Sequence, residues 1–400
     1  MKTVTSVLLV CTTVFLLGCS SNRSHVIGVR EGSVIVVDAY NVKDTIDVLL
    51  SKWVDDLEII QLDDSSIEAF FGYPYITISD HYIGIFDEGK PYRLFERQSG
   101  KYLGKIGDVG RGPGEYKWIY SSQIDESTGM IYIMPWNSNS ILTYDLNGRF
   151  IKPIPLVFMS TKGHFRVNNK NNTVIISTIP ILNSTDKIVW QQDLDGHLIG
   201  GEDAVSFALQ NTSYDEEVIR NGNTVGYDFQ IVSSIPVDKT DYLYHYNTEN
   251  NTLEPVFKLN VKNKRSIDGA HIFVTYTELP DWFIGSVVTS TPMGGIPLTW
   301  SRKSQQLVVN KTNLTGSWFR LNNDFLGIDN IRLSTTGGYY SGSYFSGGYF
   351  IQHFDPLLFI KILRRAKATG NIKVVELIQS QLPDIKEDGN NILVFGKLKK

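Results

Sequence analysis

A short pattern recurs at a spacing of 48 residues, and this repeat constrains the fold more than any other feature of the chain. Two apolar-polar runs joined by a glycine-containing turn are found around Gly100, Gly148 and Gly196. Each copy predicts two antiparallel strands joined by a tight turn in which glycine takes a positive φ. Looser copies lie at residues 246–253 and 309–314. A repeat of this length made of short strands is typical of a β-propeller.

The rest of the chain also predicts an all-β protein. Among its 400 residues are 20 Tyr, 20 Phe and 34 Gly, and short apolar runs are broken by Gly, Asn and Asp. Outside an N-terminal arm and one helical segment, the length fits six blades of about 53 residues or seven of about 45. We predict a six-bladed β-propeller. Two β-sandwiches are the alternative, although sandwiches do not repeat at this period.

One segment near the C-terminus, residues 355–386, predicts a short helical insertion in the last blade. Asp355 is a good N-cap, Pro356 suits the first helical position, and apolar residues follow at helical spacing until Gly370. A second short helix is predicted over residues 373–382. The apolar run 391–398 then predicts a buried strand, which we expect to pair with residues 57–62 and to close the ring.

The N-terminus predicts export and lipid attachment. Residues 1–18 carry Lys2, an apolar run too short to span a membrane, and Leu-Leu-Gly directly before Cys19. This pattern indicates a lipoprotein signal peptide, with Cys19 as the lipidated residue that holds the protein on a membrane. An ordinary signal peptide with a chance cysteine is the alternative. We expect an anchor and arm over residues 19–51 and the propeller over residues 52–400.

Composition restricts the compartment and the partners. Residues 20–24 lack Asp and Glu, which favours the periplasm-facing side of an outer membrane. The second cysteine, Cys11, is removed with the signal peptide, so the mature chain is predicted to have no disulfide and no cysteine metal site. The net charge is −4 and there is no basic patch. We therefore predict no nucleic-acid partner.

Residues 105–116, Lys-Ile-Gly-Asp-Val-Gly-Arg-Gly-Pro-Gly-Glu-Tyr, resemble a known family. It is the six-bladed β-propeller lipoprotein family of uncharacterised function, which is similar in architecture to NHL-repeat propellers. Its string K-I-G-x-x-G-x-G-P-G-E-Y is complete here. The family's I-P-L-E and E-D-D-N-P strings are replaced by Ile-Gln-Leu-Asp at 60–63 and Glu-Asp-Gly-Asn-Asn at 387–391. The resemblance implies a fold and a compartment but no reaction.

The same glycine-rich string holds the candidate ligand-binding residues. Its glycines allow backbone N–H groups to converge on an anion, with side-chain groups added by Arg111, Glu115 and Tyr116. The alternative, which we favour, is a structural connector in which Glu115 caps backbone groups. It is neither a dinucleotide nor a P-loop motif, because no helix follows it.

No complete catalytic or metal-binding pattern is found, and we predict no metal site and no cofactor. The seven histidines lack metal-site spacings, although a propeller can bring together one residue per blade. Two Asp-rich turns, 145–148 and 193–196, lack the further oxygen ligands of a calcium loop and read as hairpin turns. Residues 339–350, rich in Tyr, Ser and Gly, predict a strand pair with core aromatics or, alternatively, an exposed surface for sugars or peptides.

These observations predict a non-enzymatic binding or scaffold module that recognises a glycan, a peptide or a protein partner at one face of the ring. The alternatives are a hydrolase or lyase, whose site is assembled in the channel from several blades, and a sensor of envelope state. The channel lining discriminates between the first two. An amide-rich and aromatic mouth favours binding, whereas three inward histidines or a close pair of carboxylates favour an enzyme.

Overall fold

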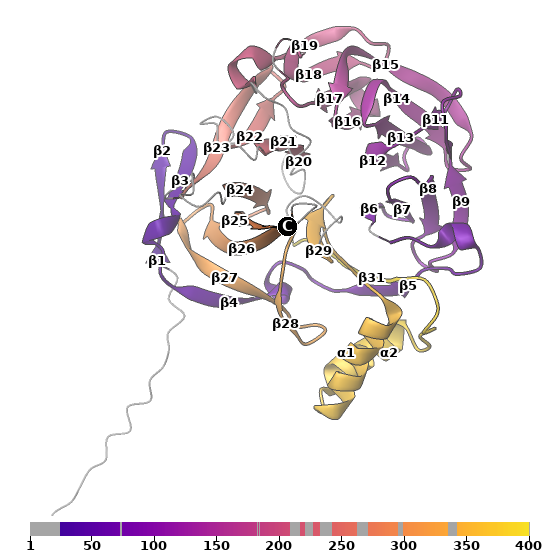
Figure 1. Ribbon diagram of the computed structural model, residues 1–400, viewed down its shortest axis with the longest axis vertical. Coiled ribbons are helices and arrows are strands. Elements are labelled where there is room, and N and C mark those ends of the chain that lie inside the picture. The colour runs from indigo at the N-terminus through magenta and orange to yellow at the C-terminus, as the bar shows by residue number, and fades with distance from the viewer. Residues whose placement is uncertain are drawn as a thin grey trace, which may run out of the picture.

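The computed structural model describes residues 25–399, except 73, 182, 184, 209–216, 221–226, 233–241, 262–270, 295–298 and 335–341. Cys19 and the predicted signal peptide lie outside the described residues. The described strands form sheets that follow one another around a ring, and two α-helices project from its rim (Figure 1). The chain is therefore an all-β protein with a β-propeller arrangement, as the repeat predicts.

Four sheets have four antiparallel strands each. The first contains β6 (Tyr75–Ile78), β7 (Tyr82–Phe86), β8 (Tyr92–Glu96) and β9 (Tyr102–Ile106). The second contains β12 (Ile119–Asp125), β13 (Met130–Pro135), β14 (Asn137–Asp145) and β15 (Phe150–Thr161). The third contains β16 (His164–Asn168), β17 (Thr173–Ser177), β18 (Lys187–Asp193) and β19 (Leu198–Asp203). The fourth, in spatial order, contains β29 (Ser343–Ser346), β30 (Tyr349–Phe354), β31 (Ile392–Lys397) and β5 (Glu58–Gln61).

Two further sheets are larger, because the N-terminal arm adds strands to them. One contains β20 (Glu217–Arg220), β21 (Asp228–Val232), β22 (Tyr242–Asn247) and β23 (Thr252–Asn260), with β3 (Val34–Asp38) and β2 (Gly28–Glu31). The other contains β24 (His271–Glu278), β25 (Trp282–Gly294), β26 (Thr299–Asn310) and β27 (Thr315–Asn323), with β1 (His25–Val26), β4 (Thr45–Leu49) and β28 (Ile328–Ile331). β3 runs parallel to β23 and β4 parallel to β27. The arm thus covers the outer strands of two sheets, an arrangement that the sequence did not predict.

The predicted blade count needs a correction. Five sheets contain a meander in which every pair of neighbouring strands is matched over at least four residue pairs. In the sheet of β20–β23, the described β21 and β22 are matched at only two pairs. Among the described residues the structure therefore has five regular blades where six were predicted. The prediction divided chain length by blade size, although the 48-residue spacing is lost after Gly196.

The repeat itself marks the hairpins that join the third and fourth strands of successive sheets. Gly100, Gly148 and Gly196 have φ values of 69°, 83° and 94°. The looser copies lie at the β22–β23 and β26–β27 turns, where Asn251 and Leu314 take positive φ instead. The positive φ predicted for the repeat glycines is confirmed.

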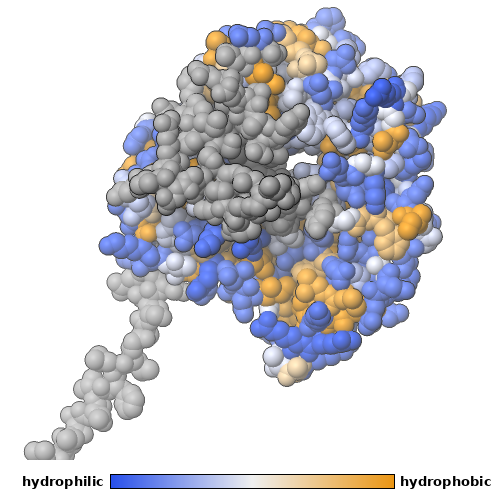
Figure 2. Space-filling view, viewed as in Figure 1, coloured by the Kyte–Doolittle hydropathy of each residue, from blue (hydrophilic) through white to orange (hydrophobic). Residues whose placement is uncertain are grey.

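The last strand shares one sheet with the first strand after the N-terminal arm, as predicted for residues 391–398 and 57–62. β31 pairs with β5 in antiparallel register, Ile392 with Gln61 and Phe395 with Glu58. Between β30 and β31 lies the predicted helical insertion, α1 (Pro356–Ala368) and α2 (Ile372–Gln381). The Asp355 side chain accepts hydrogen bonds from the N–H groups of the first turn of α1. Figure 2 shows apolar residues gathered near the insertion, where Leu357 and Leu358 are about half exposed.

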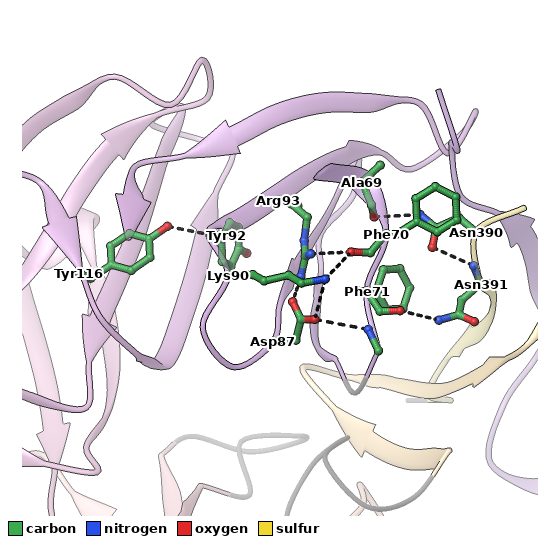
Figure 3. Close-up of polar contacts among 11 residues, drawn as sticks. Ala69, Phe70, Phe71, Asp87, Lys90, Tyr92, Arg93, Tyr116, Asn390 and Asn391 are labelled. Carbon is green, nitrogen blue, oxygen red and sulfur yellow. Dashed lines mark hydrogen bonds and ion pairs between the residues drawn. The ribbon is translucent and has the colours of Figure 1, made fainter. Parts of the chain in front are cut away.

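Polar contacts secure this closure (Figure 3). The Asn390 and Asn391 amides donate to the carbonyls of Ala69 (2.8 Å) and Phe71 (3.1 Å), in the connection from β5 to β6. Arg93 donates a hydrogen bond of 2.8 Å to the Phe70 carbonyl, which lies between those of Ala69 and Phe71 in the chain. Arg93 also forms an ion pair with Asp87. The C-terminal segment and the β7–β8 hairpin thereby hold the same short connection from two sides.

Candidate functional site

The predicted glycine-rich string forms the connection between two blades. It contains a two-stranded parallel pair, β10 (Asp108–Val109) and β11 (Glu115–Tyr116). The Glu115 carboxylate accepts a hydrogen bond of 2.7 Å from the Gly112 N–H, which is the predicted capping of backbone groups. Gly114 has a φ of 74°, and a side chain there would meet the Phe150 ring at 2.5 Å. Glycine is required here for both conformation and space.

The three candidate residues of this string do not form one exposed site. Arg111 and Glu115 are exposed, whereas Tyr116 is buried. The Tyr116 hydroxyl donates to the Ile106 carbonyl and accepts from the Tyr92 N–H at 2.9 Å. Burial raises the pKa of Tyr116 above its ordinary value. Tyr116 therefore serves the blade junction, and ligand binding by Arg111 and Glu115 stays a prediction.

The remaining sequence candidates are the segment 339–350, the two Asp-rich turns and the metal-ligating side chains. In the segment 339–350, residues 339–341 lie outside the described residues, and β29 and β30 form the predicted strand pair with buried Tyr344, Tyr349 and Phe350. The aspartates of the two Asp-rich turns accept hydrogen bonds from the N–H groups of their own turns. Among the described residues, no three His, Cys, Asp or Glu side chains gather as a metal ion would require.

The structure instead brings together a site that the sequence did not show, at the ends of the innermost strands. A cavity of about 890 Å³ opens where β6, β12 and β16 end, and residues of five sheets line it. We call it the polar hollow. Its lining contains Ser79, Asp80, Gln123, Asp125, Glu126, Arg166, Asn168, Asn169, Lys170, Asn171, Gln191, Tyr227, Tyr246, Thr248, Tyr349 and Lys397.

The two partly buried carboxylates of the polar hollow are held by neighbouring blades. Asp125 accepts from the Asn169 amide at 2.6 Å, and Glu126 lies 2.6 Å from His81 Nδ1. Partial burial raises the pKa of Asp125, but hydrogen bonds from Ser127 and Asn169 outweigh it and hold this pKa below its ordinary value. The pKa of Glu126 is lowered in the same way, by bonds from Ser79 and His81. Both groups are therefore ionised and engaged.

Amides both build and line the polar hollow. The Gln123 side chain donates to the Val167 carbonyl (3.0 Å) and accepts from the Val167 N–H (2.9 Å). These two hydrogen bonds link β12 to β16 of the neighbouring sheet. The short helical turn η4 (Asn169–Asn171) forms the rim next to it, and Lys170 and Asn171 are exposed there.

Sequence reasoning missed this site because its residues come from separate turns. The turns after β6, β12 and β16 are polar in the sequence, and polar turns are common on any all-β protein. Only the arrangement of successive blades around the ring places them around one opening. The tyrosines of the lining are buried, so the polar hollow presents amides and charges rather than aromatic faces.

Comparison with known proteins gives a family and a fold. The model of the family described as domain of unknown function DUF4934 matches residues 33–397, and the chain belongs to this family. No curated protein matches the sequence. No helix in the described part of the chain has the length and apolarity needed to cross a membrane.

Two solved structures illustrate the likeness. A Bacteroides fragilis NCTC 9343 protein, described as exported, is 17% identical with a TM-score of 0.57, and the match covers 90% of this chain and 99% of that one. A DUF4221 family member from Bacteroides vulgatus ATCC 8482 is 12% identical with a TM-score of 0.41, covering 86% and 97%. At 17% identity, the likeness to the Bacteroides fragilis protein concerns the fold alone.

Proposed function

We propose that this member of the DUF4934 family is a non-enzymatic binding module, and that its polar hollow takes a glycan, a peptide or a chain segment of a protein partner. The lining supports this proposal. Amide side chains of two neighbouring blades, Gln123 of one and Asn171 and Gln191 of the other, line an opening about the size of a small-ligand pocket, and exposed cations stand at its rim. Amides donate and accept at once, which suits the hydroxyls of a sugar or the backbone of a peptide.

The hydrogen bonds and pKa values of the two partly buried carboxylates favour binding over glycoside hydrolysis. A hydrolase that cleaves glycosidic bonds needs one carboxyl group with a raised pKa as a general acid. Asp125 and Glu126 instead have lowered pKa values and are bonded to Asn169 and His81. They act as inter-blade links, so neither is poised as the general acid of a glycosidase, and this supports the binding proposal.

We further propose that the sheet of β20–β23 is the sixth blade, so that the ring is NHL-like. Support comes from its four consecutive antiparallel strands and from its place in the ring of Figure 1. We also propose that lipidated Cys19 holds the protein on the periplasmic side of an outer membrane. The sequence around Cys19 and the exported Bacteroides fragilis relative support this location.

The test is a thermal-shift screen of the unlipidated chain from Ser20 to Lys400, which retains every described residue. Maltohexaose, chitohexaose, a muropeptide and a mixture of unstructured hexapeptides serve as probes. A ligand that binds the native state at a hundredfold its Kd stabilises it by about 2.7 kcal/mol. We expect a rise in melting temperature with a probe, and we expect this rise to be reduced in the double variant Lys170→Ala/Asn171→Ala.

The matched control is Asn147→Ala/Arg149→Ala, in the β14–β15 hairpin away from the lining. It should retain the full shift. Equal shifts in both double variants would show that the ligand does not bind in the polar hollow, and the proposal would fail. A panel that produces no shift would contradict glycan and peptide binding.

A further inference from the structure

A pair of tryptophans lies on the face of the ring opposite the polar hollow. Trp118 precedes β12, whose far end carries Asp125 of the hollow, and Trp136 follows β13, which runs antiparallel to β12. The two ring centroids are 5.4 Å apart and the rings are inclined at 45°. Trp118 is 48% exposed, while Trp136 is half-buried beside it. The pair therefore offers an inclined aromatic surface near the start of an innermost strand.

Three chain segments fix this pair in place. The Trp136 N–H donates to the Trp118 carbonyl at 2.9 Å, and the Lys162 N–H donates to the Trp136 carbonyl at 2.8 Å. Lys162 is buried, with a φ of 50°, and its Nζ lies 5.4 Å from the centroid of a Trp136 ring. A buried lysine in the left-handed region is costly, and such strain concentrates at functional sites. The Lys162 ammonium group thereby lies against the Trp136 ring.

Irregular strand pairing surrounds the same spot. The register between β12 and β13 shifts at Ile119/Ser121, and that between β14 and β15 shifts at Ser138/Ser140. Bulges of this kind re-aim side chains and are frequent beside binding sites. Exposed Asn137 follows Trp136 in the chain, and its side chain accepts a hydrogen bond from the Thr161 hydroxyl at 2.8 Å.

We propose that the Trp118–Trp136 pair is a carbohydrate-binding site. One exposed indole face is far smaller than the roughly 800 Å² per partner that a stable protein interface buries, but it matches one sugar ring. In this site, the apolar C–H face of a pyranose packs on the Trp118 ring. The site shares no residue with the polar hollow, so it does not depend on the function proposed there.

Isothermal titration of the Ser20–Lys400 chain with maltohexaose, mannohexaose, xylohexaose and chitohexaose tests this proposal. We expect one of them to bind, and Trp118→Ala to weaken its Kd at least about tenfold. Trp118→Phe retains an aromatic face and should lose less. Ile67→Ala removes a more exposed apolar side chain elsewhere and should leave the Kd unchanged.

Binding of none of the four sugars overturns the proposal, as does an unchanged Kd in Trp118→Ala. If only unstructured hexapeptides bind at Trp118, the site is a peptide site and the proposal is wrong. If sugar binding is lost in Lys170→Ala/Asn171→Ala but kept in Trp118→Ala, the sugar sits in the polar hollow. The function proposed for the hollow then stands while this inference fails. A melting temperature equal to that of the wild type confirms that each variant is folded.

Discussion

Arg93 shows at the scale of one residue how this ring places charge inside the protein. It is 1% exposed on β8, pairs with Asp87 and donates to the Phe70 carbonyl. Desolvating a guanidinium costs several kcal/mol, and this cost is offset only while both partners stay in place. Arg93 is therefore a structural residue that ties the β7–β8 hairpin to the connection from β5.

We predict that Arg93→Ala lowers the free energy of unfolding by about 3 kcal/mol, because Asp87 and the Phe70 carbonyl lose their partner. Urea denaturation measures this change. The matched control is Arg149→Ala, whose exposed pair with Asp145 is expected to contribute less than about 1 kcal/mol. Similar losses in the two variants would show that the buried pair does not secure the junction.

The closing sheet pairs the last strand, β31, with β5, the first strand after the N-terminal arm, and its stability is expected to depend on pH. His353 lies on β30, which pairs with β31. Burial lowers the pKa of His353 below the ordinary value of 6.5. The native state then binds fewer protons than the unfolded state, so this group destabilises the protein as pH falls below 6.5 towards its lowered pKa.

We predict that the fall in melting temperature between about pH 7.5 and about pH 5.5 is smaller in His353→Gln than in the wild type. His197→Gln is the control. The hydrogen bond to Asp193 raises the pKa of His197, so its contribution is present at low pH and is lost as pH rises through that pKa. His197→Gln should therefore make the fall in melting temperature between about pH 7.5 and about pH 5.5 slightly larger. An unchanged fall in His353→Gln would contradict the assignment to His353.

The elements also show what a sequence can and cannot predict. Gly148 and its repeats predicted the hairpins, since a positive φ is a local requirement. Asp355 predicted the start of α1 for the same reason. In contrast, the Gln381 side chain accepts from the Ile59 N–H and donates to the Leu57 carbonyl, each at 2.8 Å, across more than 300 residues of chain. Only the closed ring makes such contacts.

The arrangement of successive blades around the ring creates the candidate site. The turns that carry Asp80, Asp125 and Lys170 belong to three sheets and surround one opening. The predicted pairing of residues 391–398 with 57–62 was sufficient to foresee the ring. It was not sufficient to foresee which turns would carry the ligand contacts, because residues that share an opening are far apart in sequence. The arm strands β1–β4 were missed for the same reason.

We expect the ring to bind its ligand and to release it unchanged. The most direct test is to incubate the Ser20–Lys400 chain with the probe that gives the largest thermal shift and to follow that probe by mass spectrometry. We expect the probe to keep its mass, and its binding to remain sensitive to Lys170→Ala/Asn171→Ala. Cleavage of the probe by the wild type, lost in Asp125→Asn or Glu126→Gln, would contradict the claim and establish a hydrolase or lyase.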